Sequence, residues 1–351
     1  MTLDNLMADT LMAPLMASEA AETPDALRRQ IDRCAPLFQD LGERLRRLAP
    51  RFVVTGARGS SDHAATYGKY LVETQLGLPV ASIGPSVVSL YQTPLHLKDG
   101  LYIAVSQSGR SPDLLRLTET AKAGGALTVA FVNDETSPLF QMVDVAIPLC
   151  AGPEKSVAAT KSYLTSLFAF LQMVAHWKAD PALLATVADA PGWLEKAMAL
   201  DWYPGLSHLA TVRGLYIIGR GLGAAAAQEM ALKCKETSRL HADAFSAAEV
   251  IHGPLALVGP DFPVLALTQD DATLAPTSDA IRRMVGLGAT VLSTAGDIPG
   301  VVALPAVAGV PAELAPLTAV QSFYMGIHRI AADRGLNPDV PPNLAKVTET
   351  V

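Results

Sequence analysis

Apolar runs and helical segments follow each other in the same order in two parts of the chain. A β-branched run at 51–60 ends in a glycine and serine turn, and a helical pattern follows at 67–74. The stretch at 214–222 repeats this arrangement before an alanine-rich helical pattern at 224–240. Three later pairs of short apolar runs also correspond: 101–106 with 262–267, 126–131 with 289–293, and 145–149 with 301–304. Matching runs lie about 160 residues apart, which is roughly the size of one domain.

Strand-like runs that alternate with helical segments predict parallel sheets covered by helices on both faces. We therefore expect an α/β fold with two doubly wound, flavodoxin-like parallel-sheet halves. The expected parts are a helical lead-in at 1–48, a first half at 49–192, a second half at 193–335 and a tail at 336–351. Helices near 162–177 and 193–200 would bridge the two halves. Such sheets bind ligands where the carboxyl ends of strands meet helix N-termini, so the loops there are the first candidates for a site.

Composition excludes several classes of protein. Half of the 351 residues are apolar and 17% are charged, which is typical of a globular chain with enough residues for two cores. The net charge of −7 argues against nucleic-acid binding, which needs a basic face. We expect a cytoplasmic protein with no signal peptide and no membrane span. Cys34, Cys150 and Cys234 form no metal-binding spacing, which favours buried free thiols in a reducing compartment.

The loop at 106–113 follows an apolar run and opens a helical segment. Ser111 suits the N-cap of that helix, and the proline after it suits the first helical position. The free N–H groups of the first turn, with the hydroxyls of Ser106 and Ser108, favour binding of a phosphate. Helix capping alone would account for Ser111 but would leave Ser106, Gln107 and Ser108 without a role.

The loop at 56–63 occupies the matching position after the first apolar run. Gly59 allows a ligand to approach the backbone closely, and Ser60 and Ser61 can donate to sugar oxygens. An ordinary strand-to-helix turn explains this loop nearly as well. The loop at 219–223 has alternate glycines, but no acidic residue follows at the distance that binds a ribose. We therefore expect no nicotinamide cofactor.

A lysine and a carboxylate that share one helical face are candidates for proton transfer. Lys233 and Glu236 are three residues apart, with apolar neighbours on the N-terminal side. The helical segment at 229–241 begins near a candidate site loop. A carboxylate held beside a lysine can serve as a general base. An exposed salt bridge explains the pair equally well on this evidence.

Two further segments carry residues suited to acid–base or covalent chemistry. His252 precedes a Gly-Pro pair that forces a turn, and a histidine there can act as an acid or a base near neutral pH. A hydrogen bond from His252 to the local backbone is the ordinary alternative. Lys346 follows a rigid Pro-Pro pair near the C-terminus, and a docked lysine can form an imine or donate to oxygen. A solvated tail is the ordinary alternative for Lys346.

Together these segments resemble the SIS (sugar isomerase) family, from about residue 20 to Val351. The chain looks most like the isomerase half of glucosamine-6-phosphate synthase and the stand-alone SIS-type glucosamine-6-phosphate deaminases. Five motifs occur in the order that the family shows: Ser106–Gly109, Val157–Lys161, Leu232–Glu236, Glu249–Ala256 and Asn343–Lys346. The resemblance implies two SIS-type halves of the expected α/β fold.

The resemblance also implies a role for each matched residue. The residues that would hold the phosphate are Ser106, Gln107, Ser108 and Ser111. The residues that would line the sugar are Gly59, Ser60, Ser61, Val157 and Ala345. Glu236 would move a proton between C1 and C2, with support from Lys233. Lys346 would contact the open-chain sugar or form an imine with it. His252 would open the sugar ring, supplied by the other subunit of a homodimer. No metal and no other cofactor is implied.

Two departures from the synthases narrow the expected reaction. Residue 2 is Thr2 where a synthase carries the cysteine nucleophile of its glutaminase part, and Pro342 stands where synthases carry an arginine. We therefore expect no supply of ammonia, and a deaminase that converts glucosamine 6-phosphate to fructose 6-phosphate and ammonia. The alternatives are an aldose–ketose isomerase without deamination, a sugar–amine deglycase, and a sugar-phosphate sensor without turnover.

Overall fold

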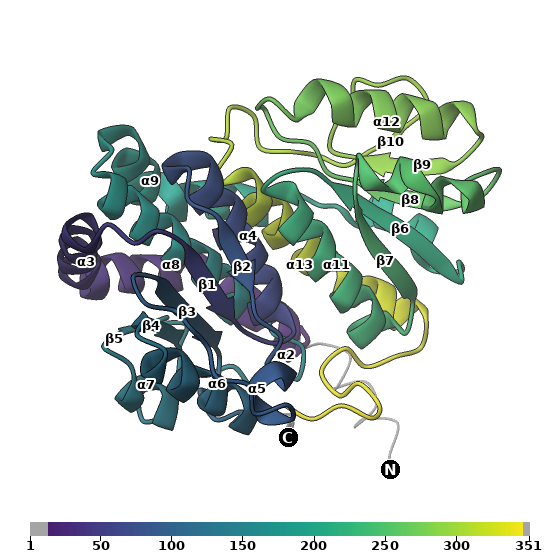
Figure 1. Cartoon of the computed structure of the whole chain (residues 1–351). Helices are drawn as coiled ribbons and strands as arrows, with labels where there is room; N and C mark the ends of the chain where they lie inside the picture. Colours follow the sequence, from purple (N-terminus) through teal and green to yellow (C-terminus); the bar gives the residue numbers. More distant parts are fainter. Residues whose placement is uncertain (1–12, 347–351) are drawn as a thin grey trace, which may run out of the picture.

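The computed structural model describes residues 13–346, which form two five-stranded parallel sheets with helices between and around them (Figure 1). The first sheet has the order β2-β1-β3-β4-β5, and the second has the order β7-β6-β8-β9-β10. The strands of the first sheet are β1 Val53–Gly56, β2 Val80–Ser82, β3 Leu101–Ser106, β4 Leu127–Val132 and β5 Val145–Pro148. Those of the second are β6 Gly214–Gly219, β7 His241–Ser246, β8 Pro263–Ala266, β9 Thr290–Ser293 and β10 Val302–Ala303. Both halves thus have the strand order of a flavodoxin-like sheet, which confirms the predicted fold class.

The helices lie between the two sheets and on their outer faces. In the first part of the chain they are α2 Leu15–Ala21, α3 Thr23–Leu48, α4 Ser60–Leu76, α5 Ser86–Ser89, α6 Pro112–Ala123, α7 Pro138–Met142, α8 Lys161–Lys178 and α9 Pro181–Met198. In the second part they are α10 Tyr203–Leu206, α11 Gly223–Ser238, α12 Leu274–Gly286 and α13 Ala315–Asp333. Short 3₁₀ turns occupy Ser207–Leu209, Glu249–His252 and Pro254–Leu257. No helix among residues 13–346 is long and apolar enough to cross a membrane.

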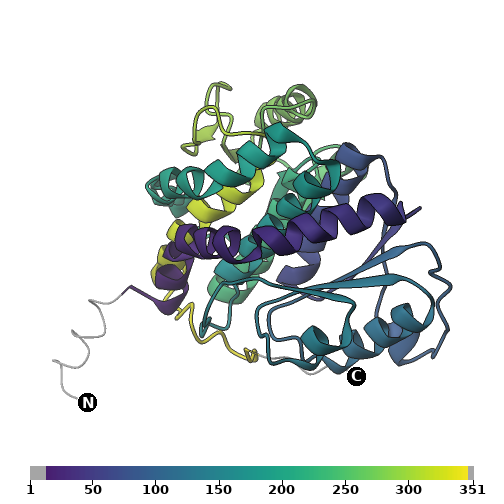
Figure 2. The same cartoon turned by 90° about the vertical axis from the view of Figure 1, so that its left-hand side faces the viewer.

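One apolar core runs across both halves, and each half also has a smaller cluster of buried side chains of its own. Every residue of β1, β3 and β4 is buried, as expected for strands covered on both faces. Helices α4, α8, α11 and α13 pack between the sheets, and one cluster of buried side chains includes Phe170, Met230 and Phe323 from α8, α11 and α13. Helix α3 packs along α8 and α9 (Figure 2). This shared layer fixes the loops of one half relative to the helices of the other.

Several element boundaries differ from those expected from the sequence. The helix predicted to continue through His241 ends at Ser238, because Arg239 adopts a left-handed backbone with φ of 48° and strand β7 begins two residues later. The edge strands β2 and β7 were not expected, since one is three residues long and the other carries polar residues. The helix expected near 193–200 is the last part of α9. The expected boundary between 192 and 193 therefore lies inside a helix.

Candidate active site

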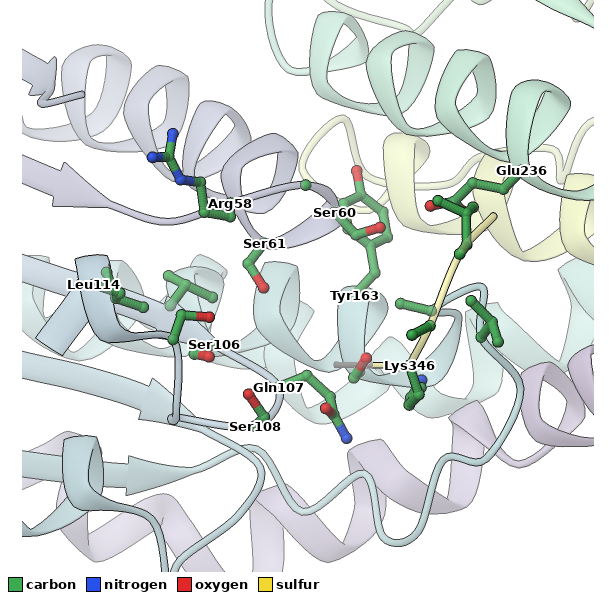
Figure 3. A pocket seen from close by; sticks show the side chains of 18 residues that line it. Arg58, Ser60, Ser61, Ser106, Gln107, Ser108, Leu114, Tyr163, Glu236 and Lys346 are labelled. Atoms are coloured by element: carbon green, nitrogen blue, oxygen red, sulfur yellow. The ribbon is translucent and has the colours of Figure 1, made fainter. Parts of the chain in front are cut away.

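A cavity of about 320 Å³ opens at the carboxyl ends of β1 and β3 (Figure 3). It is lined by the loops after these strands, the start of α8, the end of α11 and the C-terminal tail. The lining residues are Arg58, Gly59, Ser60, Ser61, Val105, Ser106, Gln107, Ser108, Ser111, Leu114, Val157, Ala159, Ser162, Tyr163, Glu236, Leu344, Ala345 and Lys346. The structure thus brings together every candidate residue from the sequence except Lys233 and His252.

The serine loop between β3 and α6 forms one end of this cavity. The Ser106 Oγ accepts a hydrogen bond of 2.9 Å from the Gly109 N–H, which closes the turn. Gly109 has a φ of 64°, and a Cβ atom there would lie 2.2 Å from the Ser137 Oγ, so only glycine fits. Ser111 occupies the N-cap of α6, but its side chain makes no capping hydrogen bond. Capping therefore does not account for the Ser111 hydroxyl, which remains available to a ligand beside the first turn of α6.

Arg58 lies beside the serine loop but is held away from it. Its guanidinium donates to the Asp113 Oδ2 at 2.7 and 3.0 Å, and the Asp113 side chain is fully buried. Figure 3 shows the Arg58 guanidinium pointing away from Ser106 and Ser108. The serine end therefore offers hydroxyls and backbone N–H groups, while Arg58 is paired with Asp113 and Arg110 of the loop itself is paired with Asp134. Sequence reasoning did not single out Arg58 or Asp113 as an ion pair.

A buried lysine connects Glu236 to a second carboxylate. Lys233 is fully buried beneath the cavity wall and donates to the Glu236 Oε2. Its Nζ also donates to the Ser60 Oγ at 3.2 Å and lies 3.3 Å from the Glu229 Oε1. The Glu236 side chain keeps 18% of its surface exposed and faces the cavity. Lys233 is therefore a buried link between two carboxylates rather than one partner of an exposed salt bridge.

Like Glu154, Glu229 is a buried carboxylate that sequence reasoning missed. Its side chain is fully buried and accepts hydrogen bonds from the Ser60 Oγ at 3.1 Å and the Tyr324 hydroxyl at 2.8 Å, and the His63 Nδ1 lies 3.0 Å away. Burial would raise the pKa of Glu229, but the Lys233 charge and these neighbours outweigh it and hold that pKa below its usual range. Burial likewise opposes the charge on Lys233, yet the two carboxylates raise its pKa. Glu229 and Lys233 are thus an ionised pair.

The tail brings Lys346 to the same end of the cavity as Glu236. The Lys346 Nζ donates to the Glu154 Oε2 at 2.9 Å. Glu154 is buried and also accepts from the Ser162 Oγ at 2.7 Å and the Thr160 N–H at 3.0 Å. Burial would raise the pKa of Glu154, but the Lys346 charge and these donors hold it below its usual range. Upstream, Asp339 accepts from the first backbone N–H groups of α2, so the described tail is fixed at two points. Residues 347–351, the rest of the expected docking tail, lie outside the described residues.

His252 does not reach this cavity within one chain. It ends the 3₁₀ turn Glu249–His252, and Gly253 after it has a φ of 140° that favours glycine. The His252 side chain is exposed and does not line the cavity that holds Glu236. Within one chain the cavity is therefore lined by the serine loop, Glu236 and Lys346 but not by His252.

Comparison with known proteins places the chain in a family. The SIS domain model matches residues 49–176 and 208–296. Glutamine–fructose-6-phosphate aminotransferase (isomerizing) of Thermotoga maritima is 34% identical, and the match covers 94% of this chain and 58% of that protein. The chain thus spans little more than half the length of this relative. It belongs to the SIS family.

Solved structures agree with this assignment. A candidate phosphosugar isomerase from Silicibacter pomeroyi has a TM-score of 0.89 and 42% identity, covering 93% of this chain and all of that one. A glucosamine-6-phosphate deaminase from Thermotoga maritima has a TM-score of 0.75 and 21% identity, covering 96% of this chain and all of that one. At that identity the second likeness shows the shared fold alone.

Proposed function

We propose that this chain is an aminosugar-phosphate deaminase that converts glucosamine 6-phosphate to fructose 6-phosphate and ammonia. The observation that supports it is the division of one cavity into two ends. Serine hydroxyls and the N-terminus of α6 stand at one end, and Glu236 and Lys346 stand at the other (Figure 3). A sugar phosphate bound between them would present its C1 and C2 to a carboxylate and a lysine.

The proposed reaction is a proton transfer followed by hydrolysis. His252 from a second copy would open the pyranose ring by acid–base catalysis. Glu236 would take the proton from C2 and return it to C1, while O1 gains a proton and the amino nitrogen loses one, which leaves a hydroxyl at C1 and an imine at C2. Water would add to that imine, and ammonia would leave with formation of the ketose. Lys233, which donates to Glu236, would fix the orientation of the carboxylate during both proton transfers.

The charges around the reacting end favour a substrate with an amino group. Three carboxylates, Glu154, Glu229 and Glu236, stand with only two ammonium groups, Lys233 and Lys346. Lys233 is shared by Glu229 and Glu236, and Glu229 has a further partner in His63, so Glu236 at the cavity has no cationic partner of its own among these groups. An ammonium group at C2 of the sugar would supply that partner, whereas the hydroxyl of an unaminated sugar would not. An ammonia-release assay over a panel of hexosamine phosphates tests the proposal, and no release from any of them would contradict it.

Replacing Ser108 by alanine is expected to weaken binding of the sugar phosphate at least about tenfold. The lost hydrogen bond to a charged oxygen is worth roughly 1.5–3 kcal/mol, and about 1.4 kcal/mol corresponds to tenfold in affinity. Titration calorimetry with the sugar phosphate measures the change, and circular dichroism checks the fold. Ser86→Ala on the short helix α5, outside the cavity lining, serves as the matched control. Equal affinities for the two variants would refute the phosphate role of Ser108.

Turnover is expected to survive extensive chelation, because the proposed mechanism uses only protein side chains. Among residues 13–346, no three His, Cys, Asp or Glu side chains gather so that they could hold a metal ion. The assay compares ammonia release before and after dialysis against a strong chelator, with metal content measured in parallel. A stoichiometric metal whose removal abolishes activity, and whose return restores it, would contradict the mechanism.

Mixing two inactive variants is expected to restore activity if His252 acts across a dimer interface. His252→Ala and Glu236→Gln chains would form mixed dimers with one site that has both groups. Equal mixing should recover about one quarter of wild-type activity, since half of the dimers are mixed and each has one intact site. Mass spectrometry of the assembled complexes verifies subunit exchange. Exchange without any recovered activity would show that each chain completes its own site.

A further inference from the structure

Two of the three cysteines, 116 residues apart in the chain, meet in the fold. The Cys34 Sγ on α3 lies 3.8 Å from the Cys150 Sγ, just beyond β5. Both thiols also lie near one acceptor, the Pro148 carbonyl, at 3.5 and 3.7 Å. Cys234 on α11 is fully buried in the shared core. The expectation of buried free thiols therefore holds for Cys34 and Cys234, whereas Cys150 is only partly buried.

The surroundings of the pair make one thiol reactive and accessible. Cys150 is partly exposed, whereas Cys34 is fully buried. A hydrogen bond from the Cys34 thiol and the nearby Arg33 charge lower the pKa of Cys150 to about 7, although burial opposes this. The pKa of Cys34 is raised, because its thiol donates the hydrogen bond to Cys150 and because Cys34 itself is buried. Burial raises the pKa of Cys234 to about 12, so the three thiols differ in reactivity.

Hydrogen bonds fix the backbone at Cys150, and the chain continues from there to the candidate site. Cys150 has a φ of 55°, a left-handed conformation that is uncommon outside glycine. Arg29 on α3 donates to the Cys150 carbonyl at 3.2 Å, and the Asn133 side chain bonds both Ala151 and Gly152. Four residues beyond Cys150 stands Glu154, the partner of Lys346. The thiol pair thus lies where α3 meets the segment that supports the candidate site.

We propose that Cys34 and Cys150 form a peroxide-sensitive dithiol that closes reversibly into a disulfide and ties α3 to the 150–154 segment. The Cys150 thiolate attacks hydrogen peroxide and breaks the O–O bond, which gives a sulfenic acid and one water after protonation. The Cys34 sulfur then attacks the Cys150 sulfur, an S–S bond forms, and the S–O bond breaks. The Cys34 proton leaves with the hydroxide as a second water. The two thiols lose two electrons, which the peroxide accepts.

Closure requires only a small movement. A disulfide has an S–S distance of about 2.05 Å, so the sulfur atoms must approach by about 1.8 Å from their 3.8 Å separation. The 26-residue helix α3 packs against α8 and α9, whereas Cys150 stands in a loop. We expect the loop to make most of the movement. The cross-link would restrict the unfolded chain across 116 residues and thereby stabilise the folded state.

Thiol mapping of the full chain tests the proposal without any assay of turnover. The reduced protein is treated with hydrogen peroxide, blocked with a maleimide in denaturant and digested. One disulfide-linked peptide pair containing Cys34 and Cys150 is expected, with Cys234 blocked, and dithiothreitol should return all three free thiols. Cys150 still free after peroxide treatment, or linked to any other cysteine, would overturn the proposal.

Variants separate the two chemical steps. Cys34→Ser should leave a Cys150 sulfenic acid that dimedone captures, and Cys150→Ser should leave Cys34 reduced. Peroxide should raise the urea midpoint of unfolding of the wild type and of the matched control Cys234→Ser, and dithiothreitol should reverse the rise. Cys34→Ser should show no rise, and Cys34→Ala replaces it if the serine variant does not fold. An unchanged wild-type midpoint after the disulfide has formed would refute the tie between α3 and the 150–154 segment.

Discussion

Replacing Glu236 by glutamine is expected to lower the rate of ammonia release from glucosamine 6-phosphate by about 10²–10⁴-fold. Glutamine keeps the shape of the side chain, and its carbonyl can still accept the hydrogen bond from Lys233. It cannot take a proton from carbon, so the transfer between C2 and C1 loses its base. The sugar phosphate should still bind, because the serine loop stands at the other end of the cavity (Figure 3). A large loss in kcat with a small change in KM is therefore expected.

Steady-state kinetics with coupled detection of ammonia measures this loss. Glu119→Gln is the matched control, because Glu119 is an exposed carboxylate on α6 outside the cavity lining. Full activity in Glu236→Gln would place the base elsewhere. A wild type that interconverts unaminated hexose phosphates but frees no ammonia from any hexosamine phosphate would replace the deaminase proposal by an aldose–ketose isomerase. Both reactions use the same proton transfer, so the Glu236 result and the ammonia result answer separate questions.

The serine loop is the part of the site that could be predicted, because its geometry depends on local sequence. A strand, a turn with small residues and a helix start within eight positions, so the hydroxyls of Ser106, Ser108 and Ser111 must gather near one helix N-terminus. The fold was predictable for a similar reason. The repeated order of apolar runs fixes alternating strands and helices, and parallel strands then place their loops on one edge.

Contacts between distant segments could not be predicted, since no local pattern encodes them. Glu229 looked like one more charge on an alanine-rich helix, yet packing of α11 against α4 and α13 buries it among Ser60, His63 and Tyr324. Glu154 likewise becomes part of the site only through its contact with Lys346, which is 192 residues away in the sequence. The sequence also could not place His252 relative to the cavity, and the structure puts its turn outside the cavity lining.

Replacing Lys233 by methionine is expected to lower the free energy of unfolding at pH 7 by about 3–5 kcal/mol. Methionine fills a similar volume but leaves the fully buried Glu229 without its lysine partner. Removing one member of a buried ion pair costs more than the pair contributes, because the remaining charge stays desolvated. Urea unfolding measures the loss. Lys235→Met is the matched control, since Lys235 is an exposed lysine two positions along the same helix, and losing its hydrogen bond to the Ala242 carbonyl should cost only about 1 kcal/mol.

Two further measurements identify the cause of that loss. The pKa of Glu229 is held below its usual range in the wild type, so its ionised form contributes stability above the pKa of an unfolded glutamate, about 4.3. That contribution is lost as the pH falls through the lowered folded pKa. Without Lys233 the folded pKa of Glu229 should rise above its unfolded value instead. The variant should therefore be destabilised most near pH 7 and progressively less as the pH falls. The stability gap between the two proteins should therefore narrow as the pH falls toward 4.

The double variant Lys233→Met, Glu229→Gln completes the argument. Glu229→Gln removes the unpaired buried charge but keeps an amide oxygen that can accept from Ser60 and Tyr324. We expect it to recover a substantial part of the loss, as a coupled pair in contact should in a double-mutant cycle. Two results would show that the buried pair is not the source of stability. Lys233→Met could be as stable as Lys235→Met, or the double variant could lose as much free energy of unfolding as the two single variants added together. Lys233 would then serve Glu236 alone, and its burial beneath the cavity would be a requirement of catalysis rather than of folding.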